Sequence, residues 1–523
     1  MFSQVNTFLN HGYQASAARI ESTVLPGLPS FTFNGIERGQ ARETEGRLRS
    51  AFVYSGFRWP KGRIISSLSP NWDSKGERNC DLPVALSILQ ASGQIPECSM
   101  GESTTFVGEL GLDGRIYGGS GAFPVVEAMS AEESVGVFSV EYRQLTQFFP
   151  GMKWIAVRTL SETVDAWKGL IEPEVVESEK IKERAVPLAE ELRAEQVLRA
   201  FQGQETALRA FLISLSGWHP LLLIGSPGCG KSMLASTARY LLPALREDEM
   251  FTLRKLYSVA EKYDEKVFDF GARPYIAPHH SVTASALIGG GAPIKPGLLS
   301  LAHGGVLFLD ELNEIKENVI NLLREPLENA EIHIARSDQQ LSLPADCLLI
   351  AAANPCPCGF AADNHYLCRC QPYQIKKQIQ RISGPIMDRF HLLSIMLHLP
   401  VEDLEKLSGK TNDKSFSLEL KNKIKEAHER QYERQVFLGE EAILNGRNRS
   451  PHRFHHWQIS DKAKEAASKM AESFHLTARS YCSLLAVSRT IADLDKCERI
   501  LEDHVVEAIC YRVNLEEKIG VEI

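Results

Sequence analysis

The stretch that decides the fold is Leu221-Leu222-Leu223-Ile224-Gly225-Ser226-Pro227-Gly228-Cys229-Gly230-Lys231-Ser232, and a helix-forming run, residues 233–238, follows it. The apolar residues 221–224 predict a buried strand, and the glycines after it let successive backbone N–H groups point at phosphate oxygens. Lys231 would bring a positive charge to the β- and γ-phosphates, and Ser232 would ligate Mg²⁺. The strand, the loop and the helix come in the order that this motif requires. Residues 225–232 therefore predict a nucleotide site rather than an incidental glycine-rich turn.

Two further apolar runs end in polar residues that suit the same chemistry. Residues 306–309 lead into Asp310, which would hold Mg²⁺ through water, and Glu311, which would polarise the attacking water. Two such acids are also common in a helix N-cap and first turn, but a P-loop about 80 residues upstream favours the catalytic interpretation. Residues 347–353 end in Asn354, whose amide either orients the same water or starts a turn together with the proline that follows.

Length and composition describe an ordinary folded protein. The 523 residues suit roughly two to four domains, and a content of 44% hydrophobic and 24% charged residues excludes a disordered tail, a collagen-like fibre and a small disulfide scaffold. The net charge of -8, from 58 Lys and Arg against 66 Asp and Glu, argues against a globally basic nucleic-acid binder but leaves local basic faces open. The apolar runs are far shorter than the ~20 residues of a membrane helix, and no secretory signal is visible. We therefore expect a cytoplasmic protein with no membrane partner.

The pattern along the chain predicts three folded parts and one linker. Residues 1–168 mix short extended runs with helical ones, and residues 169–192 form a charged strip between two apolar regions, as a linker does. Residues 193–397 alternate strands and helices, which predicts an α/β core around a parallel sheet. Residues 398–523 turn helical, and no period of 20–50 residues indicates a repeat array.

The 11 cysteines are unevenly placed, and their odd number argues against a fully paired secreted framework. Seven are scattered, and each is expected to be a small buried apolar residue. The other four, Cys356, Cys358, Cys368 and Cys370, form C-x-C, nine intervening residues and C-x-C. Four thiolates can bind one structural Zn²⁺ tetrahedrally, although this spacing is tighter than the usual C-x₂₋₄-C. Reduced structural thiols and a redox pair are the alternatives.

Further segments give the chain a resemblance that extends over nearly its whole length. Five lie in the core and three in the N-terminal third: His279-His280-Ser281, Gly289–Gly291, Pro296–Glu311, Asn354–Gly359, Ser383–Phe390, Gly27–Phe31, Cys80–Pro83 and Val107–Gly114. With them the chain resembles the magnesium-chelatase-like AAA+ ATPases and, among these, the YifB/ComM family. The resemblance implies an α/β protein with a Lon-protease-like α+β domain at the N-terminus, an AAA+ core with a parallel sheet, and a C-terminal helical lid.

The resemblance also assigns roles to single residues. Arg389 would be an arginine finger that enters the site of a neighbouring subunit in a hexamer, which makes hydrolysis depend on ring assembly. Gln204 would pack near the adenine, with a plain helix cap as the alternative. In the helical lid, Arg479 would be the second sensor arginine, and Arg489 is the alternative.

Two departures from the family pattern concern the N-terminal domain and a core hairpin. Asp81-Leu82-Pro83 takes the place of the Ser-Ala-Gly of a Lon-type protease, so we expect a proteolytically inactive domain that serves assembly or recruitment. Residues 332–347 lack the expected Phe-Pro-Ala-Arg-Phe, and if this hairpin touches DNA, Arg336 would be its cation.

The function implied by the resemblance is that of a Mg-ATP-dependent hexameric motor on single-stranded or branched DNA. As a helicase it would promote branch migration in recombination or natural transformation, alongside recombination or competence proteins. Lys376-Lys377 and residues 447–457 concentrate basic and aromatic residues, which either contact phosphates or form solvated loops. Two alternatives remain open: a protein-remodelling ATPase whose Lon-like domain recruits a partner, and a nucleotide-gated scaffold without turnover. No porphyrin pocket and no large metal-binding partner domain are indicated, so chelation is not expected.

Overall fold

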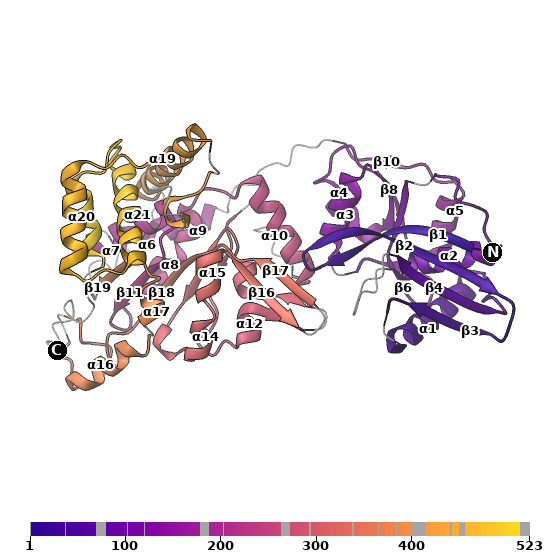
Figure 1. The fold of residues 1–523 in the computed structure, drawn as a ribbon, viewed down its shortest axis with the longest axis horizontal. Helices are drawn as coiled ribbons and strands as arrows, with labels where there is room; N and C mark the ends of the chain where they lie inside the picture. Colours follow the sequence, from indigo (N-terminus) through magenta and orange to yellow (C-terminus); the bar gives the residue numbers. More distant parts are fainter. Residues whose placement is uncertain are drawn as a thin grey trace.

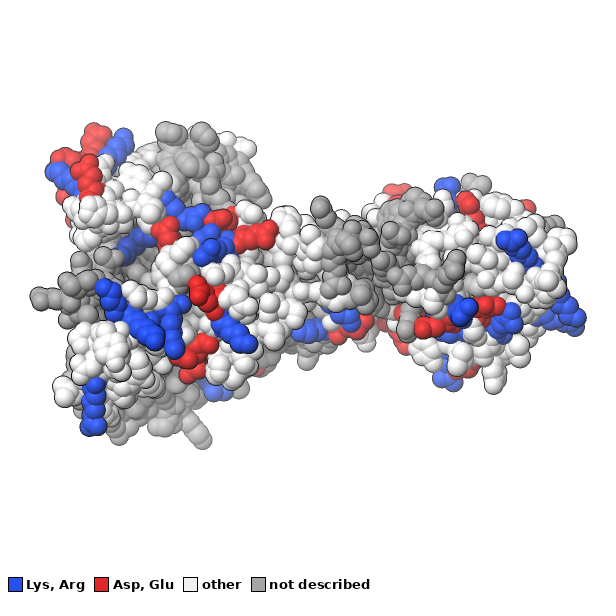
Figure 2. All heavy atoms as spheres, turned by 60° about the horizontal axis from the view of Figure 1, so that its bottom comes forward, with Lys and Arg blue, Asp and Glu red and all other residues white. Residues whose placement is uncertain are grey.

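The computed structural model describes residues 2–36, 38–69, 80–101, 103–119, 121–177, 188–201, 203–262, 272–291, 294–336, 339–363, 366–382, 384–398, 415–439, 442–448 and 456–512. They form an N-terminal body and a larger body, which meet at a narrower waist (Figure 1; Figure 2). Basic and acidic side chains are interspersed over the face in Figure 2, and its most extended basic group lies on the larger body. Within the described ranges, no helix combines the length and the apolar character needed to cross a bilayer.

Among the described residues, an eight-stranded mixed sheet forms the centre of the N-terminal body. Its strands, in sheet order, are β10 (Glu174–Val175), β9 (Lys153–Val157), β8 (Val135–Ser139), β5 (Thr104–Val107), β1 (Phe2–His11), β2 (Gln14–Leu25), β4 (Arg63–Ser69) and β3 (Ser30–Asn34). A small hairpin and several helices accompany it: β6 (Glu109–Leu110), β7 (Ile116–Tyr117), α1 (Arg38–Tyr54), α2 (Asp81–Ala91), α3 (Ala122–Ala131), α4 (Arg143–Thr146) and α5 (Leu160–Trp167).

Both faces of this sheet are covered, because side chains alternate across a strand. Val137 and Ile155 pack with α1, α2 and α5, whereas their neighbours Phe138 and Trp154 pack with α3 on the other face. The short strand β10 pairs with β9 and thus belongs to this sheet, although it lies in the stretch expected to be a linker. Residues 178–187 of that stretch lie outside the described residues.

The larger body holds a five-stranded sheet whose strands all run parallel, which confirms the prediction for this part of the chain. In sheet order the strands are β12 (Tyr275–Ile276), β15 (Val306–Leu309), β18 (Leu348–Ala353), β11 (Leu221–Gly225) and β19 (Leu392–Met396). The strands β11, β15 and β18 are buried along their whole length, and this explains why each is a continuous apolar run.

Helices cover both faces of the parallel sheet. One face carries α6 (Leu188–Ala200), α7 (Glu205–Gly217), α8 (Lys231–Ser236) and α9 (Ala238–Leu241), and the other carries α12 (Ala284–Ile288), α13 (Leu298–Leu301) and α14 (Glu317–Asn321). Around them lie α15 (Arg324–Asn329), α16 (Pro372–Gln380), α17 (Gly384–Met387), and the two-stranded pairs β13 (Gly289–Gly290) with β14 (Lys295–Pro296) and β16 (Glu331–Arg336) with β17 (Gln339–Pro344).

The C-terminal region is helical, as its pattern predicts, although residues 399–414 and 513–523 lie outside the described residues. Its helices are α19 (Ser415–Phe437), α20 (Asp461–Ser473), α21 (Ala478–Leu494) and α22 (Glu502–Cys510). Ile424, Leu484 and Val505 are fully buried in the same apolar cluster as α6 and α7, so this region packs on one face of the core. It lies at the end of the molecule away from the N-terminal body (Figure 1).

The two bodies meet at α10 (Glu247–Val259), a core helix that packs against α3 (Figure 1). The ring of Phe251 lies 5.7 Å from that of Phe123 on α3, and the guanidinium of Arg254 lies 3.7 Å from the ring centroid of Phe148. Aromatic and cation–π contacts of this kind add to the apolar area that the contact buries.

The N-terminal body also reaches the β16–β17 hairpin. A Cβ placed on Gly12, in the turn between β1 and β2, would lie only 2.1 Å from a methyl group of Leu341 on β17. The hairpin is the segment that departs from the family pattern. The side chain of Arg336, its expected cation, lies outside the described residues.

Candidate nucleotide site and its surroundings

The P-loop leaves the carboxyl end of β11 and turns into α8. Gly228 and Gly230 adopt left-handed backbone angles, with φ of 81° and 90°, which are strained for other residues. The Lys231 ammonium donates to the carbonyl oxygens of Gly225 and Ser226 at 2.7 and 3.0 Å, and burial lowers its pKa. The loop thus has the curled backbone and the buried cation that phosphate binding requires.

The predicted partners of the P-loop meet it at one edge of the sheet. The strand β18 lies between β11 and β15, so the carboxyl ends of all three strands come together. The Ser232 hydroxyl donates to Oδ2 of Asp310 at 2.6 Å, and the Lys231 ammonium donates to Oδ1 of Asn354 at 3.2 Å. The hydroxyl and the carboxylate are oxygen ligands of the kind that Mg²⁺ prefers, so these two residues fit the ion.

Glu311 lies beside Asp310 and has a strained backbone conformation. Its φ is 48°, in the left-handed region, and its N–H donates to Oδ1 of Asp310 at 2.9 Å. Nδ1 of His280 lies 3.0 Å from Oε2 of Glu311. His280 lies within one of the family-like runs, but a histidine in that run carries no sequence signal for a role beside the catalytic acid. Below them, the Asn313 amide donates to the carbonyl of Asn354 at 3.1 Å and so fixes the end of β18.

Gln204 joins the start of α7 to the end of β19. Its amide nitrogen donates to the carbonyl of Leu397 at 2.9 Å, and its amide oxygen accepts from the Leu397 N–H at 3.2 Å. This two-sided bond places the side chain where the last strand of the sheet leaves the nucleotide edge. Gln204 also stands at the N-cap position of α7, although its side chain makes no cap hydrogen bond to that helix, so both interpretations of this residue remain open.

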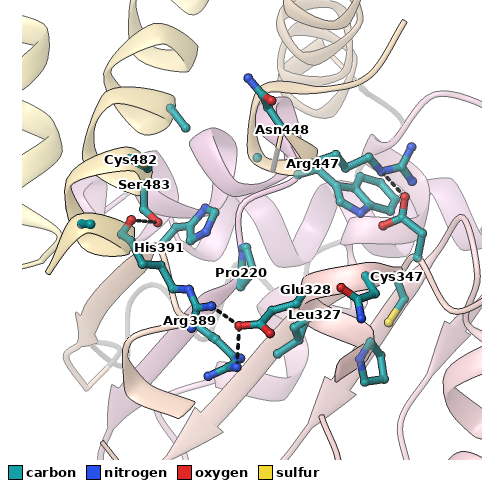
Figure 3. A pocket seen from close by; sticks show the side chains of 18 residues that line it. Pro220, Leu327, Glu328, Cys347, Arg389, His391, Arg447, Asn448, Cys482 and Ser483 are labelled. Atoms are coloured by element: carbon teal, nitrogen blue, oxygen red, sulfur yellow. Dashed lines mark hydrogen bonds and ion pairs between the residues drawn. The ribbon is translucent and has the colours of Figure 1, made fainter. Parts of the chain in front are cut away.

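The proposed finger and sensor arginines lie together at the opposite edge of the sheet, in a cavity of about 480 Å³ (Figure 3). Arg389 donates to Glu328 at 2.7 Å, and Arg479 donates to the same carboxylate. The His391 N–H donates to the carbonyl of Pro220, which precedes β11, so the cavity lies at the amino ends of the strands. About 17 Å of strand therefore separates these arginines from the P-loop of their own chain.

The alternative sensor, Arg489, is a structural residue of the helical region. Its side chain is 1% exposed and donates to Asp493 at 3.0 Å. It also donates to the carbonyl oxygens of Cys497 and Glu498, at 2.6 and 2.7 Å. These bonds hold the guanidinium of Arg489 inside the helical region, where it cannot reach a nucleotide. Arg479 therefore remains the proposed sensor.

The four clustered cysteines converge around one point. Their Sγ atoms all lie within 4.8 Å of one another, and three of the pairs are 3.3–3.7 Å apart. Zn–S bonds of about 2.3 Å in a tetrahedron place the sulfur atoms about 3.8 Å apart, so the cluster has the size of a Cys₄ zinc site. Burial raises the pKa of Cys358, but N–H bonds from Phe360 and Arg369 outweigh it and bring that pKa to about 6. The N–H of Cys370 also donates to Sγ of Cys368 at 3.4 Å.

The seven scattered cysteines follow the expected burial only in part. Cys80, Cys229 and Cys347 are buried, Cys98, Cys482 and Cys497 are half-buried, and Cys510 is exposed.

For Arg447 and Trp457, both interpretations of residues 447–457, as a phosphate contact and as a solvated loop, are wrong, because both side chains are largely buried. The Arg447 guanidinium lies 4.1 Å from the Trp218 ring centroid and pairs with Asp346 at 2.9 Å and Glu249 at 3.4 Å, and Trp457 is 6% exposed. Burial raises the pKa of Glu249, but the charges of the buried Arg273 and of Arg447 outweigh this effect and hold that pKa at about 2. Residues 449–455 lie outside the described residues. The exposed pair Lys376 and Lys377, on α16, remains available to solvent.

In the N-terminal body, the place expected for a protease nucleophile holds a buried ion pair. Asp81, at the start of α2, is 1% exposed and accepts from Arg47 at 2.8 and 3.1 Å. The Leu110 N–H also points at this carboxylate, at 3.4 Å. The carboxylate is therefore engaged in holding α1, α2 and β6 together. Proteolytic inactivity of this region stays a prediction.

Comparison with known proteins places these features in a family. A model of magnesium chelatase subunit ChlI matches residues 197–404, a model of the C-terminal part of that subunit matches residues 414–512, and a further ChlI model matches residues 20–139. The uncharacterized protein YifB of Salmonella typhimurium is 35% identical over 513 residues, which cover 97% of this chain and 96% of its own. Competence protein ComM of Haemophilus influenzae is 34% identical over 512 residues and 97% of each chain. DNA replication licensing factor Mcm6 of Drosophila melanogaster is 25% identical over 222 residues, which cover 41% of this chain and 25% of its own.

The parallel sheet and the residues at its carboxyl edge define an AAA+ P-loop ATPase, whose cofactors are ATP and Mg²⁺. The full-length matches are more specific than the class. The chain belongs to the YifB/ComM family of magnesium-chelatase-like AAA+ ATPases. The match over residues 20–139 assigns the N-terminal region to the ChlI subunit family, and its likeness to a Lon protease stays a prediction.

Proposed function

We propose that the protein is a hexameric, cytoplasmic motor that couples hydrolysis of Mg-ATP to movement along single-stranded or branched DNA. As a helicase it promotes branch migration during recombination or natural transformation and works with recombination or competence proteins. We propose a ring because Arg389 and Arg479 lie far from the P-loop of their own chain and can serve only the P-loop of a neighbouring subunit. The proposal that DNA is the substrate is supported by the relatives and by local basic surface on this chain.

Each residue at the nucleotide edge has a task in hydrolysis. Lys231 and the P-loop N–H groups bind the phosphates, and Gln204 holds the end of β19 beside the base. Ser232 and Asp310 would hold Mg²⁺, Asp310 through water, and the bound ion would supply positive charge against the phosphates. Glu311 orients the attacking water and accepts its proton, and Asn354 fixes the position of that water relative to the phosphates.

The site is completed by a neighbouring subunit. Arg389 and Arg479 converge on Glu328 at the amino edge of the sheet. An arginine side chain is shorter than β11, so neither of the two can reach the P-loop of its own chain. A head-to-tail interface brings the amino edge of one subunit against the carboxyl edge of the next, and such interfaces close into rings. The two cations then leave Glu328 and stabilise the charge that develops on the transferred phosphate.

Two observations support DNA as the polymer on which the motor acts: the names of two relatives and the local basic side chains on the larger body. One full-length relative is a competence protein and a partial one is a DNA replication licensing factor. Lys376 and Lys377 are exposed on α16, and Figure 2 shows a basic group on the larger body of a chain whose net charge is -8. A motor that tracks the phosphate backbone needs only such local contacts, without readout of the bases.

The test is steady-state ATP hydrolysis by the purified protein, with no DNA, with a single strand and with a four-way junction. The Glu311→Gln variant, which keeps the P-loop, serves as the blank. We expect DNA to stimulate hydrolysis and the junction to be resolved only when ATP is hydrolysed. Turnover that is indifferent to both DNAs would refute the DNA motor, and an assembled ring without turnover would leave the nucleotide-gated scaffold.

A protein-remodelling ATPase is the second candidate, and one contact favours it. The N-terminal body touches the β16–β17 hairpin through Gly12 and Leu341, so a partner recruited by that body is delivered next to the hairpin. Stimulation of hydrolysis by an unfolded protein substrate, together with indifference to DNA, would select this alternative.

The cysteine cluster supports one structural zinc ion in each chain. Cys356, Cys358, Cys368 and Cys370 supply four thiolates at tetrahedral spacing and leave no open position for catalysis. Metal analysis of the purified protein tests this proposal, with one Zn²⁺ per chain expected and none in a Cys368→Ser/Cys370→Ser variant. Metal-free protein with four reactive thiols would refute it.

A further inference from the structure

The segment that carries the four cysteines begins directly after Asn354 and lies against the P-loop. We call the described residues of this segment, 355–363 and 366–370, the cysteine loop. Asp363, midway along it, accepts a hydrogen bond from the buried Ser226 hydroxyl at 2.5 Å. A Cβ on Gly359 would lie 2.4 Å from Cδ of Pro227, so the backbone of the cysteine loop is in close contact with the P-loop. The two contacts fall on consecutive P-loop residues, at the first turn after β11.

A third contact extends the cysteine loop to the other side of the site. The ring of Tyr366 packs edge-on against His398, with the ring centroids 5.6 Å apart. His398 follows Leu397, the residue that Gln204 grips from both sides. The cysteine loop therefore spans from the phosphate-binding turn to the end of β19, and it contacts protein on both sides of the nucleotide edge.

The position of Asp363 depends on how the cysteine loop is closed. Cys356 and Cys358 lie before it and Cys368 and Cys370 after it, so a metal bound by all four pins both ends of the segment together. Without that closure, placing Asp363 on Ser226 costs the conformational entropy of ordering the whole segment. Ser226 and Pro227 would then lose two contacts that fix the backbone whose N–H groups bind phosphate.

We propose that zinc in the cysteine loop clamps the first turn of the P-loop, so that metal occupancy sets the affinity for nucleotide. This inference rests on the zinc site proposed above and is independent of the DNA motor. Asp363 is a positioning residue: it acts on the nucleotide through Ser226. Zinc and nucleotide are then positively coupled, because each favours the same ordered arrangement of the two loops.

The experiment measures binding of a fluorescent ADP analogue to the full chain, before and after removal of zinc with a chelator. If the metal-free P-loop is competent about a tenth of the time, the apparent Kd rises about tenfold. The Asp363→Ala variant should retain its zinc and show a similar rise in Kd, and removal of zinc from it should add little, because the contact is already lost. Cys510→Ser, at an exposed cysteine outside the loop, should show the native Kd and the native rise on removal of zinc, which assigns the effect of the chelator to the clustered cysteines.

Reciprocity provides a second readout that does not use activity. Saturating ADP should tighten zinc binding by the same factor, measured by competition with a coloured zinc chelator at equilibrium. An unchanged Kd in metal-free protein and in Asp363→Ala would overturn the clamp while leaving the zinc site intact. Absence of zinc would overturn both. If removal of zinc unfolds the chain, the zinc-loaded Asp363→Ala variant decides, and native affinity there refutes the proposal.

Discussion

Mixing two inactive variants tests whether Arg389 acts on a neighbouring subunit. Lys231→Ala removes the phosphate-binding cation but leaves Arg389 in place, and Arg389→Ala does the reverse. Since about 17 Å of strand lies between the two residues within one chain, neither variant can complete its own site. Loss of an arginine finger lowers the rate by roughly 10³–10⁵-fold, which corresponds to about 4–7 kcal/mol of transition-state stabilisation.

The expected recovery follows from counting interfaces. In a ring of randomly placed subunits mixed one to one, about a quarter of the interfaces pair an intact P-loop with an intact Arg389, so hydrolysis should return to about a quarter of the native rate. The matched control mixes Lys231→Ala with Glu311→Gln, in which every Arg389 is intact and no site has a complete catalytic edge, so no recovery is expected. If the first mixture shows only the average of its two components, while size measurements confirm mixed rings, Arg389 does not act in trans.

Three further outcomes are expected from the geometry. Arg47→Ala should destabilise the N-terminal body by roughly 3–5 kcal/mol, because it removes the cation of the ion pair that the buried Asp81 carboxylate makes, and the melting temperature should recover in Arg47→Ala/Asp81→Asn. The pKa of Glu249 is about 2 in the folded protein, below the usual 4.5, so the stability that it contributes, about 3 kcal/mol, is fully present above pH 4.5 and is lost as the pH falls toward 2. A Glu249→Gln variant should accordingly show a flatter dependence of melting temperature on pH over that range. His280→Ala should lower kcat up to about tenfold with little change in KM, because the half-exposed Glu311 loses one hydrogen bond that positions it; a change confined to KM would contradict this role.

The parallel sheet and its catalytic edge were predictable because their sequence signals are local. Residues 221–224 and 306–309 are continuous apolar runs, as strands buried on both faces must be, and each is followed at once by residues that are predicted to act on phosphate. A motif that occupies one strand, one turn and one helix carries its geometry with it. The cysteine cluster was predictable for the same reason, since its four thiols fall within one short segment.

The long-range partners of the site residues were not predictable, because no local sequence pattern indicates which distant residues the fold brings into contact. Glu328 and Asp363 are ordinary acids in the sequence, and only the fold brings one to the arginines and the other to Ser226. Arg447 shows the opposite case, a local signal that the fold overrides. A basic residue in a polar stretch resembles a solvent-exposed cation, yet it stacks on Trp218 in the protein interior, where buried acids offset its charge.

We propose, then, that the nucleotide edge is controlled from two sides that differ in kind. Asp363 and the cysteine loop act from within the subunit, on the turn that binds phosphate, so they should change the Kd for nucleotide. Arg389 would act from the neighbouring subunit, on charge that develops only as the phosphate is transferred, so it should change the rate at saturating ATP far more than the Kd. A variant that alters one quantity and spares the other separates the two controls. Because the P-loop lies at one end of β11 and the arginines at the other, the two controls do not share a contact within one chain.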